Sequence, residues 1–294
     1  MFYRRKVLMA LLQSFDGQLE KIALQKLLFL MTSKQKEATY SFIPFHFGSY
    51  SISANADLTA MVRHGLLTED VNNFSKADKT NYVHKLTIED QKILSEIKSN
   101  YEKLNSKELM KFTYLNFSYY AINSKTAKDI LTKSEYEKVL SAKPINDRTI
   151  LFTIGYEGIS LEEYLNRLIK NDVKTLVDVR NNPVSMKFGF SKNTLRLYCE
   201  KLGIEYIHVP EVGIRSEYRQ GLKVQADYNE LFEQYKKSTL QETKDHQNKI
   251  LEILKNKRRI ALTCFESDTS KCHRSYLAKS IIELSDWKFE LKHI

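Results

Sequence analysis

The stretch Ile260-Ala-Leu-Thr-Cys-Phe-Glu-Ser-Asp-Thr-Ser-Lys-Cys-His-Arg274 determines how the second half of the chain is interpreted. Residues 260–265 form a short apolar run with the length of a buried strand. Residues 267–271 contain no apolar side chain, and helical periodicity returns over residues 272–284. The stretch therefore predicts a strand, a polar loop and a helix, in that order.

Reactive side chains crowd the point where this strand ends and the helix begins. They are Cys264, Glu266, Cys272, His273 and Arg274. Exposed N–H groups at the start of a helix favour an anion, and Arg274 would add a guanidinium that binds phosphate or carboxylate. We therefore expect the chemistry of the protein in this stretch.

Residues 149–294 alternate between apolar runs and amphipathic segments. The periodicity predicts strands at residues 150–154, 174–179, 204–209 and 260–265, with a last strand at residues 287–293 at an edge of the sheet. It predicts helices at residues 160–170, 191–202, 224–237, 243–255 and 272–284. This alternation indicates an α/β domain with a doubly wound, mostly parallel, Rossmann-like sheet and right-handed crossovers.

Each of the first four predicted strands ends in polar side chains. Tyr156 and Glu157 follow the first strand, Asp178 and Arg180 the second, and His208 ends the third. Cysteines follow the fourth strand, as described above. Because ligands bind outside the carboxyl ends of the strands in open α/β sheets, we expect these residues to share one site.

Several of these residues have a functional and a structural interpretation. Asp178 would be a general base or a metal ligand and Arg180 an anion clamp, but the two share a strand face and could simply pair with each other. Glu157 would be a second acid–base carboxylate or a partner for a helix dipole. His208 would bind the anion or serve as a structural histidine, and Tyr156 would contact the substrate.

The cysteines favour nucleophilic chemistry over a zinc site. The step from Cys264 to Cys272 is not a standard zinc-ligand spacing and a fourth ligand is missing, so no metal ligand is assigned. Cys272, at a helix N-terminus beside His273 and Arg274, is expected to have a lowered pKa. The sequence does not identify a cofactor; a divalent cation bound by carboxylates is one candidate.

The loop at residues 210–222 lies over the same end of the predicted sheet. A loop of this length usually forms a lid or a binding segment. Arg215 and Arg219, with Lys187, Phe188 and Phe190 from an earlier loop, would line a groove for an anionic polymer.

Residues 1–90 are predicted to be mostly helical with a short β segment. The run Gln25-Lys-Leu-Leu-Phe-Leu30 favours a buried helix, and Phe47-Gly-Ser-Tyr-Ser51 a turn before a second helix. Residues 82–86 would form the second strand of a wing. This order predicts a winged-helix-like domain, and the two motifs resemble the SocA/Panacea type of antitoxin-associated domain. A packing module without a nucleic-acid role is the alternative.

Residues 91–148 are predicted to be a helical extension or linker. The aromatic side chains at residues 112–120 would belong to the core or form a stacking platform for bases. Lys143-Pro-Ile-Asn-Asp-Arg-Thr149 interrupts the helical pattern, so we expect the last domain to begin at residue 149.

Five ordered motifs from residue 150 onward resemble a known family. They are Thr153-Ile-Gly-Tyr-Glu-Gly158, Asp178-Val-Arg-Asn-Asn-Pro183, Gly189-Phe-Ser-Lys192, Gly203-Ile-Glu-Tyr-Ile-His-Val-Pro210 and Cys264-Phe-Glu with Cys272-His-Arg274. Over about residues 150–284 the chain is similar to the family named domain of unknown function number 488. The resemblance implies an α/β fold with these motif residues clustered, and no established reaction.

The overall composition narrows the functional classes. A net charge of +10 over 294 residues suits a polyanionic partner. The odd count of three cysteines argues against a disulfide framework and for a reducing cytoplasm. No apolar run reaches the length of a membrane span, so no membrane is expected. The sequence also lacks a Gly-x-Gly-x-x-Gly or P-loop motif.

Together these observations predict a cytoplasmic enzyme of the hydrolase or transferase type that processes nucleic acid or a nucleotide. The alternatives are a non-catalytic DNA-binding regulator, or a phage-defence or antitoxin-like protein with a partner chain, whose α/β domain senses an anionic ligand. The substrate and the oligomeric state do not follow from the sequence.

Overall fold

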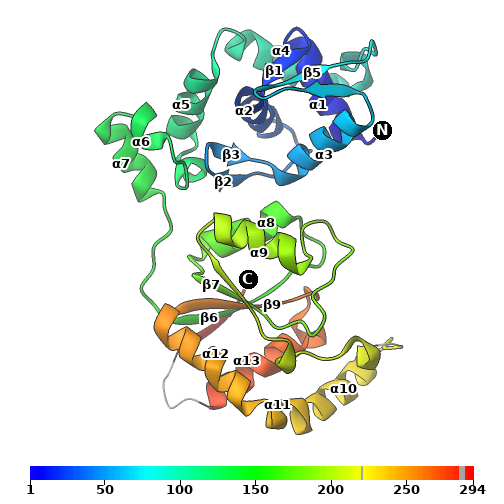
Figure 1. The fold of residues 1–294 in the computed structure, drawn as a ribbon, viewed down its shortest axis with the longest axis vertical. Coiled ribbons are helices and arrows are strands. Elements are labelled where there is room, and N and C mark those ends of the chain that lie inside the picture. Colours follow the sequence, from blue (N-terminus) through cyan, green and yellow to red (C-terminus); the bar gives the residue numbers. More distant parts are fainter. Residues whose placement is uncertain (220, 285–288) are drawn as a thin grey trace. The chain divides into compact units, whose positions relative to one another are not determined.

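The computed structural model describes residues 1–219, 221–284 and 289–294, with the side chain of Ser216 excepted. The chain divides into two compact units, Met1–Lys143 and Pro144–Ile294 (Figure 1). The helices between residues 88 and 141 belong to the first unit. Among the described residues, no helix has the length and apolarity needed to cross a membrane.

The first unit combines helices with short antiparallel strands. Its elements are α1 (Tyr3–Ser14), β1 (Gln18–Glu20), α2 (Lys21–Thr32), β2 (Ile43–Phe45), β3 (Gly48–Tyr50), α3 (Ile52–Arg63), β4 (Leu67–Glu69), β5 (Asn73–Lys76), the 3₁₀ turn η1 (Val83–Lys85), α4 (Ile88–Tyr101), α5 (Ser106–Asn116), η2 (Ser118–Ala121), α6 (Ala127–Ile130) and α7 (Lys133–Ser141).

Two small sheets lie beside these helices. Three strands pair in the order β1-β5-β4, and β2 and β3 form a separate hairpin. Ser51 caps α3, because its side chain accepts a hydrogen bond from the backbone of Ala54. The prediction of a strand at residues 82–86 is wrong: they contain η1, and the strand that pairs with β4 is β5. The polar sequence Asn-Phe-Ser-Lys of β5 lacks the apolar alternation by which a strand is recognised.

The predicted aromatic segment packs in the core of the first unit. Tyr114 is almost fully buried, and the rings of Phe117 and Tyr120 contact Phe29 of α2 edge-on, at centroid distances of 4.9 and 4.6 Å. These contacts account for the aromatic composition without a nucleic-acid ligand.

The second unit has the predicted alternation of strands and helices. Its elements are β6 (Ile150–Gly155), α8 (Leu161–Lys170), β7 (Thr175–Asp178), α9 (Lys192–Lys201), β8 (Glu205–His208), η3 (Pro210–Val212), η4 (Ser216–Arg219), α10 (Gln225–Lys237), α11 (Thr239–Glu242), α12 (Lys244–Lys257), β9 (Arg259–Cys264), η5 (Thr269–Lys271), α13 (His273–Glu283) and β10 (Glu290–His293).

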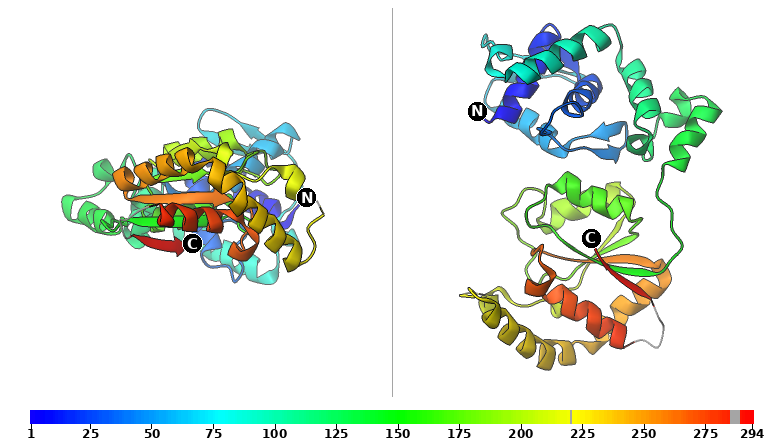
Figure 2. Two further views of the ribbon diagram at one scale, coloured as in Figure 1. Left: turned by 90° about the horizontal axis from the view of Figure 1, so that it is seen from below. Right: turned by 180° about the vertical axis from the view of Figure 1, so that it is seen from behind.

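A five-stranded, fully parallel sheet in the order β10-β6-β9-β7-β8 forms the centre of this unit, which confirms the predicted α/β class. Helices α8 and α9 cover one face, and α12 and α13 cover the other (Figures 1 and 2). The last strand, β10, lies at the edge beside β6, whereas the predicted start of that strand at residue 287 lies outside the described residues.

Strand alternation assigns side chains to the two faces. Leu151, Val177 and Leu262 pack in one core cluster with residues of α10, α12 and α13. Their neighbours therefore point towards α8 and α9, as the hydrogen bond from Tyr164 of α8 to Thr263 shows. Asp178 shares this second face, because it is offset from Val177 by one residue. Side chains from both faces can come together at the edge of the sheet where the strands end.

Candidate functional site

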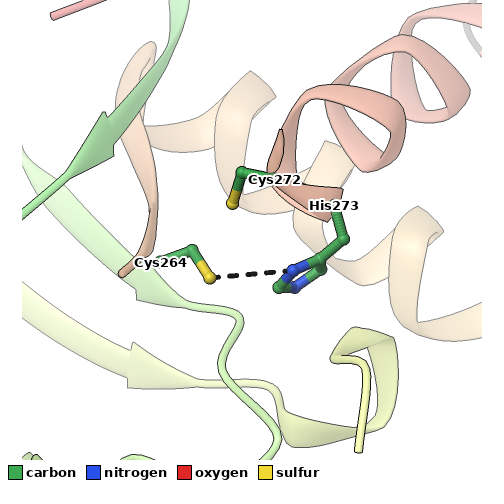
Figure 3. A group of neighbouring side chains, drawn as sticks. All are labelled: Cys264, Cys272 and His273. Atoms are coloured by element: carbon green, nitrogen blue, oxygen red, sulfur yellow. Dashed lines mark hydrogen bonds between the residues drawn. The ribbon is translucent and has the colours of Figure 1, made fainter. Parts of the chain in front are cut away.

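A cysteine–histidine pair lies at the carboxyl end of β9. Cys264 is the last residue of that strand, and Cys272 and His273 stand at the start of α13 (Figure 3). The Cys264 sulfur lies 3.6 Å from Nδ1 of His273. The polar loop predicted between strand and helix thus folds back, bringing residues nine positions apart into contact.

The backbone immediately after β7 fixes the orientation of the imidazole. Nε2 of His273 lies 3.1 Å from the carbonyl oxygen of Val179, which can only accept a hydrogen bond. Nε2 therefore carries a proton, and Nδ1 faces the sulfur of Cys264. The ring of Tyr235 contacts the imidazole edge-on at 5.7 Å, and its hydroxyl donates to the carbonyl oxygen of Val212. The histidine is held on both sides.

Arg219 and Glu266 complete the surroundings of the sulfur. The guanidinium of Arg219 donates to a carboxylate oxygen of Glu266 and, at 2.7 Å, to Nδ1 of His273. The other carboxylate oxygen of Glu266 lies 3.2 Å from the Cys264 sulfur. Nδ1 of His273 therefore accepts from Arg219, while Nε2 donates to Val179.

The two neighbouring cysteines have opposite acidities. A hydrogen bond from Cys272 holds the pKa of the Cys264 thiol well below its ordinary value, and the positive charge of Arg219 lowers it further. Burial and the nearby Cys264 raise the pKa of Cys272 well above its ordinary value. The prediction of a lowered pKa for Cys272 is therefore wrong, since it considered the helix N-terminus without burial. Cys264 is therefore the more acidic thiol of the pair.

Glu266 is shifted towards its protonated form. Burial raises the pKa of its carboxyl group, and the charge of Cys264 raises it further, against the opposing effect of Arg219. The carboxyl group of Glu266 and the sulfur of Cys264 can therefore exchange a proton. One group of the pair can attack while the other supplies a proton.

Asp178 and Arg180 form a buried ion pair on the opposite face of the sheet. Arg180 donates from Nε and Nη2 to the two carboxylate oxygens of Asp178, whose exposed fraction is 0%. Nη1 of Arg180 donates to the hydroxyl of Tyr156 and to the carbonyl of Phe190, each at 2.8 Å. The hydroxyl of Tyr206 also donates to Asp178. The structural interpretation, mutual pairing, is the one observed.

A pocket of about 280 Å³ connects these two groups. We call it the thiol pocket; it is lined by Tyr156, Arg180, Asn181, Asn182, Val184, Ser185, Met186, Ile214, Arg219, Cys264, Phe265 and His273. It lies at the carboxyl end of β9, which stands between β6 and β7 in the sheet. The chain continues from β9 to a helix on one face of the sheet, whereas it continues from β6 and from β7 to helices on the other face. Such a switch point is where open α/β sheets bind ligands.

Gly155 and Arg274 position the loop after β9. A Cβ on Gly155 would lie 1.9 Å from the carbonyl oxygen of Glu266, so only glycine lets the loop pack against the end of β6. Arg274 is 2% exposed and donates to the backbone carbonyls of Glu266 and Ser267. Its guanidinium therefore holds the loop from behind, and Arg274 is not among the residues that line the thiol pocket.

Three further predicted residues lie outside the thiol pocket. Glu157 is exposed and accepts hydrogen bonds from the backbone N–H and hydroxyl of Ser267. His208 bridges the carbonyl oxygen of Arg180 and the ammonium of Lys192, at 2.9 and 3.0 Å. Arg215 lines a separate pocket beside α10 and α11. The thiol pocket therefore includes Tyr156, Arg180, Cys264 and His273 from the predicted set.

The predicted groove for a polymer separates into different environments. Phe190 is fully buried, with its ring stacked on Tyr156 at 4.2 Å, and Lys187 donates to the carbonyl oxygen of Tyr156. Phe188 is 53% exposed. Of the two arginines of the loop, Arg219 reaches the thiol pocket.

A metal ion would have three ligands in this cluster. The sulfurs of Cys264 and Cys272 and a ring nitrogen of His273 lie within 4.8 Å of one another, and thiolate with imidazole suits zinc. The guanidinium of Arg219, however, already donates to the Nδ1 lone pair that would face such an ion. The arrangement with Arg219 in place therefore favours a thiolate stabilised by hydrogen bonds.

Sequence reasoning missed two supporting residues. Tyr206 lies two positions before His208 on β8, so period-two alternation could have placed it on the same face as Asp178. Tyr235 lies in α10, far from any motif, and its contact with His273 depends on tertiary packing alone.

The comparisons with known proteins identify a family over part of the second unit. Residues 160–281 match the family described as Domain of unknown function DUF488. No curated protein and no solved structure matches the chain. The matched residues include Asp178, Arg180, Cys264, Cys272 and His273. The resemblance to domain of unknown function number 488 is therefore confirmed for residues 160–281, within the second unit.

Proposed function

We propose that the second unit is a cysteine-dependent hydrolase or transferase whose substrate carries a phosphate group, as in a nucleotide or a nucleic acid. The observation that carries this proposal is the position of the Cys264 sulfur, 3.6 Å from Nδ1 of His273 in a pocket that also contains Arg219 and Arg180. A thiolate with a low pKa beside arginines is a nucleophile suited to an anionic substrate.

Each residue has a chemical role in the proposed reaction. The Cys264 thiolate attacks phosphorus, an S–P bond forms, and the bond from phosphorus to the leaving oxygen breaks. The carboxyl group of Glu266 gives its proton to that oxygen. Glu266 then takes a proton from water, the water oxygen attacks phosphorus, and cleavage of the S–P bond restores the thiolate. Arg219 would stabilise the charge on the phosphate oxygens.

The buried ion pair supports this site from behind. Asp178 holds the guanidinium of Arg180 through two hydrogen bonds, and Arg180 holds the hydroxyl of Tyr156. A guanidinium fixed in this way is oriented before the substrate arrives. Asp178 thus acts as a positioning residue in this proposal.

The test is turnover of p-nitrophenyl phosphate and bis-p-nitrophenyl phosphate by the full chain. Cys264→Ser should lower kcat by about three orders of magnitude or more, with unchanged circular dichroism. Cys199→Ala is the matched control, because Cys199 is buried on α9 away from the thiol pocket and should keep its activity. A Cys264→Ser variant with full activity would refute the nucleophile.

Glu266 gives a second signature of the same reaction. Glu266→Gln should slow alkyl phosphates by about a hundredfold, since a general acid matters most for a poor leaving group. It should slow p-nitrophenyl phosphate much less. An equal loss of rate with both substrates would show that Glu266 is not the general acid.

The first unit supports a second proposal, a DNA-binding role. We infer a winged-helix-like arrangement from the order α1, β1, α2, α3, β4, β5 with strands paired as β1-β5-β4, and from the hairpin β2–β3 inserted between α2 and α3. If the protein is a regulator, Cys264→Ser should keep a salt-dependent affinity for duplex DNA equal to that of the wild type. An enzyme that only processes nucleotides should show no such affinity in either form.

A further inference from the structure

Two sequence motifs of the first unit meet in the structure. Gln25 and Lys26 of α2 reach the segment that contains β3. The side-chain oxygen of Gln25 accepts from the backbone N–H of Ser51 at 2.9 Å, and the Lys26 ammonium donates to the carbonyl oxygen of Ser49 at 2.7 Å. These contacts join the Gln25–Leu30 run to the Phe47–Ser51 turn.

The turn approaches the lysine closely because it contains a glycine. Gly48 has a φ of +89°, and a Cβ built on it would lie 3.3 Å from Nζ of Lys26 and 2.5 Å from the ring of Tyr114. Any other residue would therefore push the hairpin away from α2.

A pocket of about 630 Å³ opens beside this contact. We call it the lysine pocket. Its apolar lining includes Ile22, Phe45, Leu58 and Phe74, and Lys26 is one of its polar residues. The volume falls within the range of small-molecule sites, which are mostly apolar with a few placed polar groups.

Lys26 is buried without a carboxylate partner among the residues that the structure describes. It is 2% exposed, and its ammonium donates to Ser49, at the carbonyl oxygen and, at 3.5 Å, at the hydroxyl. An ammonium has three donors and normally takes an anionic partner when buried. Burial lowers the pKa of Lys26 to about 7.

The charged neighbours of the pocket have other partners. Glu20 accepts a hydrogen bond from Ser106, and Lys21 forms an ion pair with Glu69 at 2.7 Å. The other titratable groups around Lys26 are His46 and Tyr50 of the hairpin and Tyr114 of α5. None of the ion pairs among the described residues joins Glu20 to Lys26.

We propose that the lysine pocket binds an amphipathic organic anion, with its carboxylate or phosphate on Lys26 and a flat apolar body against Phe45, Leu58 and Phe74. The ligand supplies the negative charge that the protein omits. Because a bound anion favours the charged lysine, binding near neutral pH is coupled to proton uptake. The site lies in the first unit and does not depend on the chemistry of Cys264.

The test is titration calorimetry of the full chain with 2-naphthoate and with 2-naphthamide, a neutral compound of nearly the same shape. At the pKa of Lys26, about 7, naphthoate should bind at least about tenfold more tightly than the amide. Measured in two buffers with different ionisation enthalpies, it should take up about half a proton per ligand, since about half of Lys26 is neutral. Equal binding of the two compounds, or no binding of either, would overturn the proposal.

Lys26→Met is the decisive variant, because methionine retains the length of the side chain without its charge. The preference for naphthoate and the proton uptake should both vanish, whereas Lys21→Met should retain the uptake. A Lys26→Met protein that keeps the preference would contradict the assignment. If this variant does not fold, the wild type still gives a result: its naphthoate affinity should fall by up to about tenfold per pH unit above the pKa of Lys26. A constant affinity would refute the proposal.

Discussion

The thiol pocket and the lysine pocket differ in how the buried charges beside them are neutralised. In the second unit, Asp178 and Arg180 are buried as a bidentate pair, and Glu266 pairs with Arg219. Among the residues that the structure describes, the ammonium of Lys26 in the first unit donates to the neutral oxygens of Ser49. Because the charged side chains around the thiol pocket are paired with one another, the sulfur of Cys264 remains as its reactive group. The ammonium of Lys26 lacks such a pair, so an anionic ligand in the lysine pocket could neutralise it.

The largest expected effect comes from breaking the complete pair. Asp178→Asn leaves Arg180 buried without its counter-charge, so the free energy of unfolding should fall by about 3–5 kcal/mol. At pH 7, Lys26→Met removes a side chain with no ionic partner among the described residues and should stay within about 1.5 kcal/mol of the wild type. Urea denaturation measures both.

An exposed ion pair provides the control for this comparison. Lys255 and Glu252 lie 2.8 Å apart on the surface of α12, with side chains 44% and 62% exposed. Lys255→Met should therefore change the unfolding free energy by less than about 0.5 kcal/mol. Equal losses in Asp178→Asn and Lys26→Met would show that the two regions do not differ.

A smaller expected effect is the pH dependence that Lys26 gives to the unfolding free energy. The pKa of Lys26 falls from its ordinary 10.5 to about 7 on folding, so between these values the unfolded chain binds more protons than the folded chain. Stability from this group therefore rises with pH, by up to about 1.4 kcal/mol per unit. The unfolding free energy of the wild type minus that of Lys26→Met should increase from about pH 7 to about pH 9. If this difference in unfolding free energy stays constant with pH, burial does not lower the pKa of Lys26.

The sequence predicts regular features of the fold that arise from local patterns. The alternation of apolar runs and helices from residue 150 predicted the parallel sheet, and period-two spacing placed Asp178 and Arg180 within reach of each other. Cys272 was misjudged because the position at a helix N-terminus is visible in the sequence, whereas burial is not. The strand β5 was missed because its residues are mostly polar.

Contacts between distant segments could not be predicted. The motifs around Lys26 and Gly48 were recognised separately, but their contact depends on how the hairpin β2–β3 packs on α2. Arg219 was expected to bind a polymer, and its contact with Nδ1 of His273 spans 54 positions in the chain. Such contacts are set by tertiary packing, which no single segment encodes.

The proposed function depends on a low pKa of the Cys264 thiol, which the pH dependence of its alkylation measures. The rate of reaction with iodoacetamide, followed by peptide mass spectrometry, should show an inflection well below the ordinary cysteine pKa of about 8.5. Arg219→Met should move that inflection upward, because it removes a positive charge beside the thiolate. An inflection at or above about 8.5, or faster alkylation of Cys272 than of Cys264, would contradict the account.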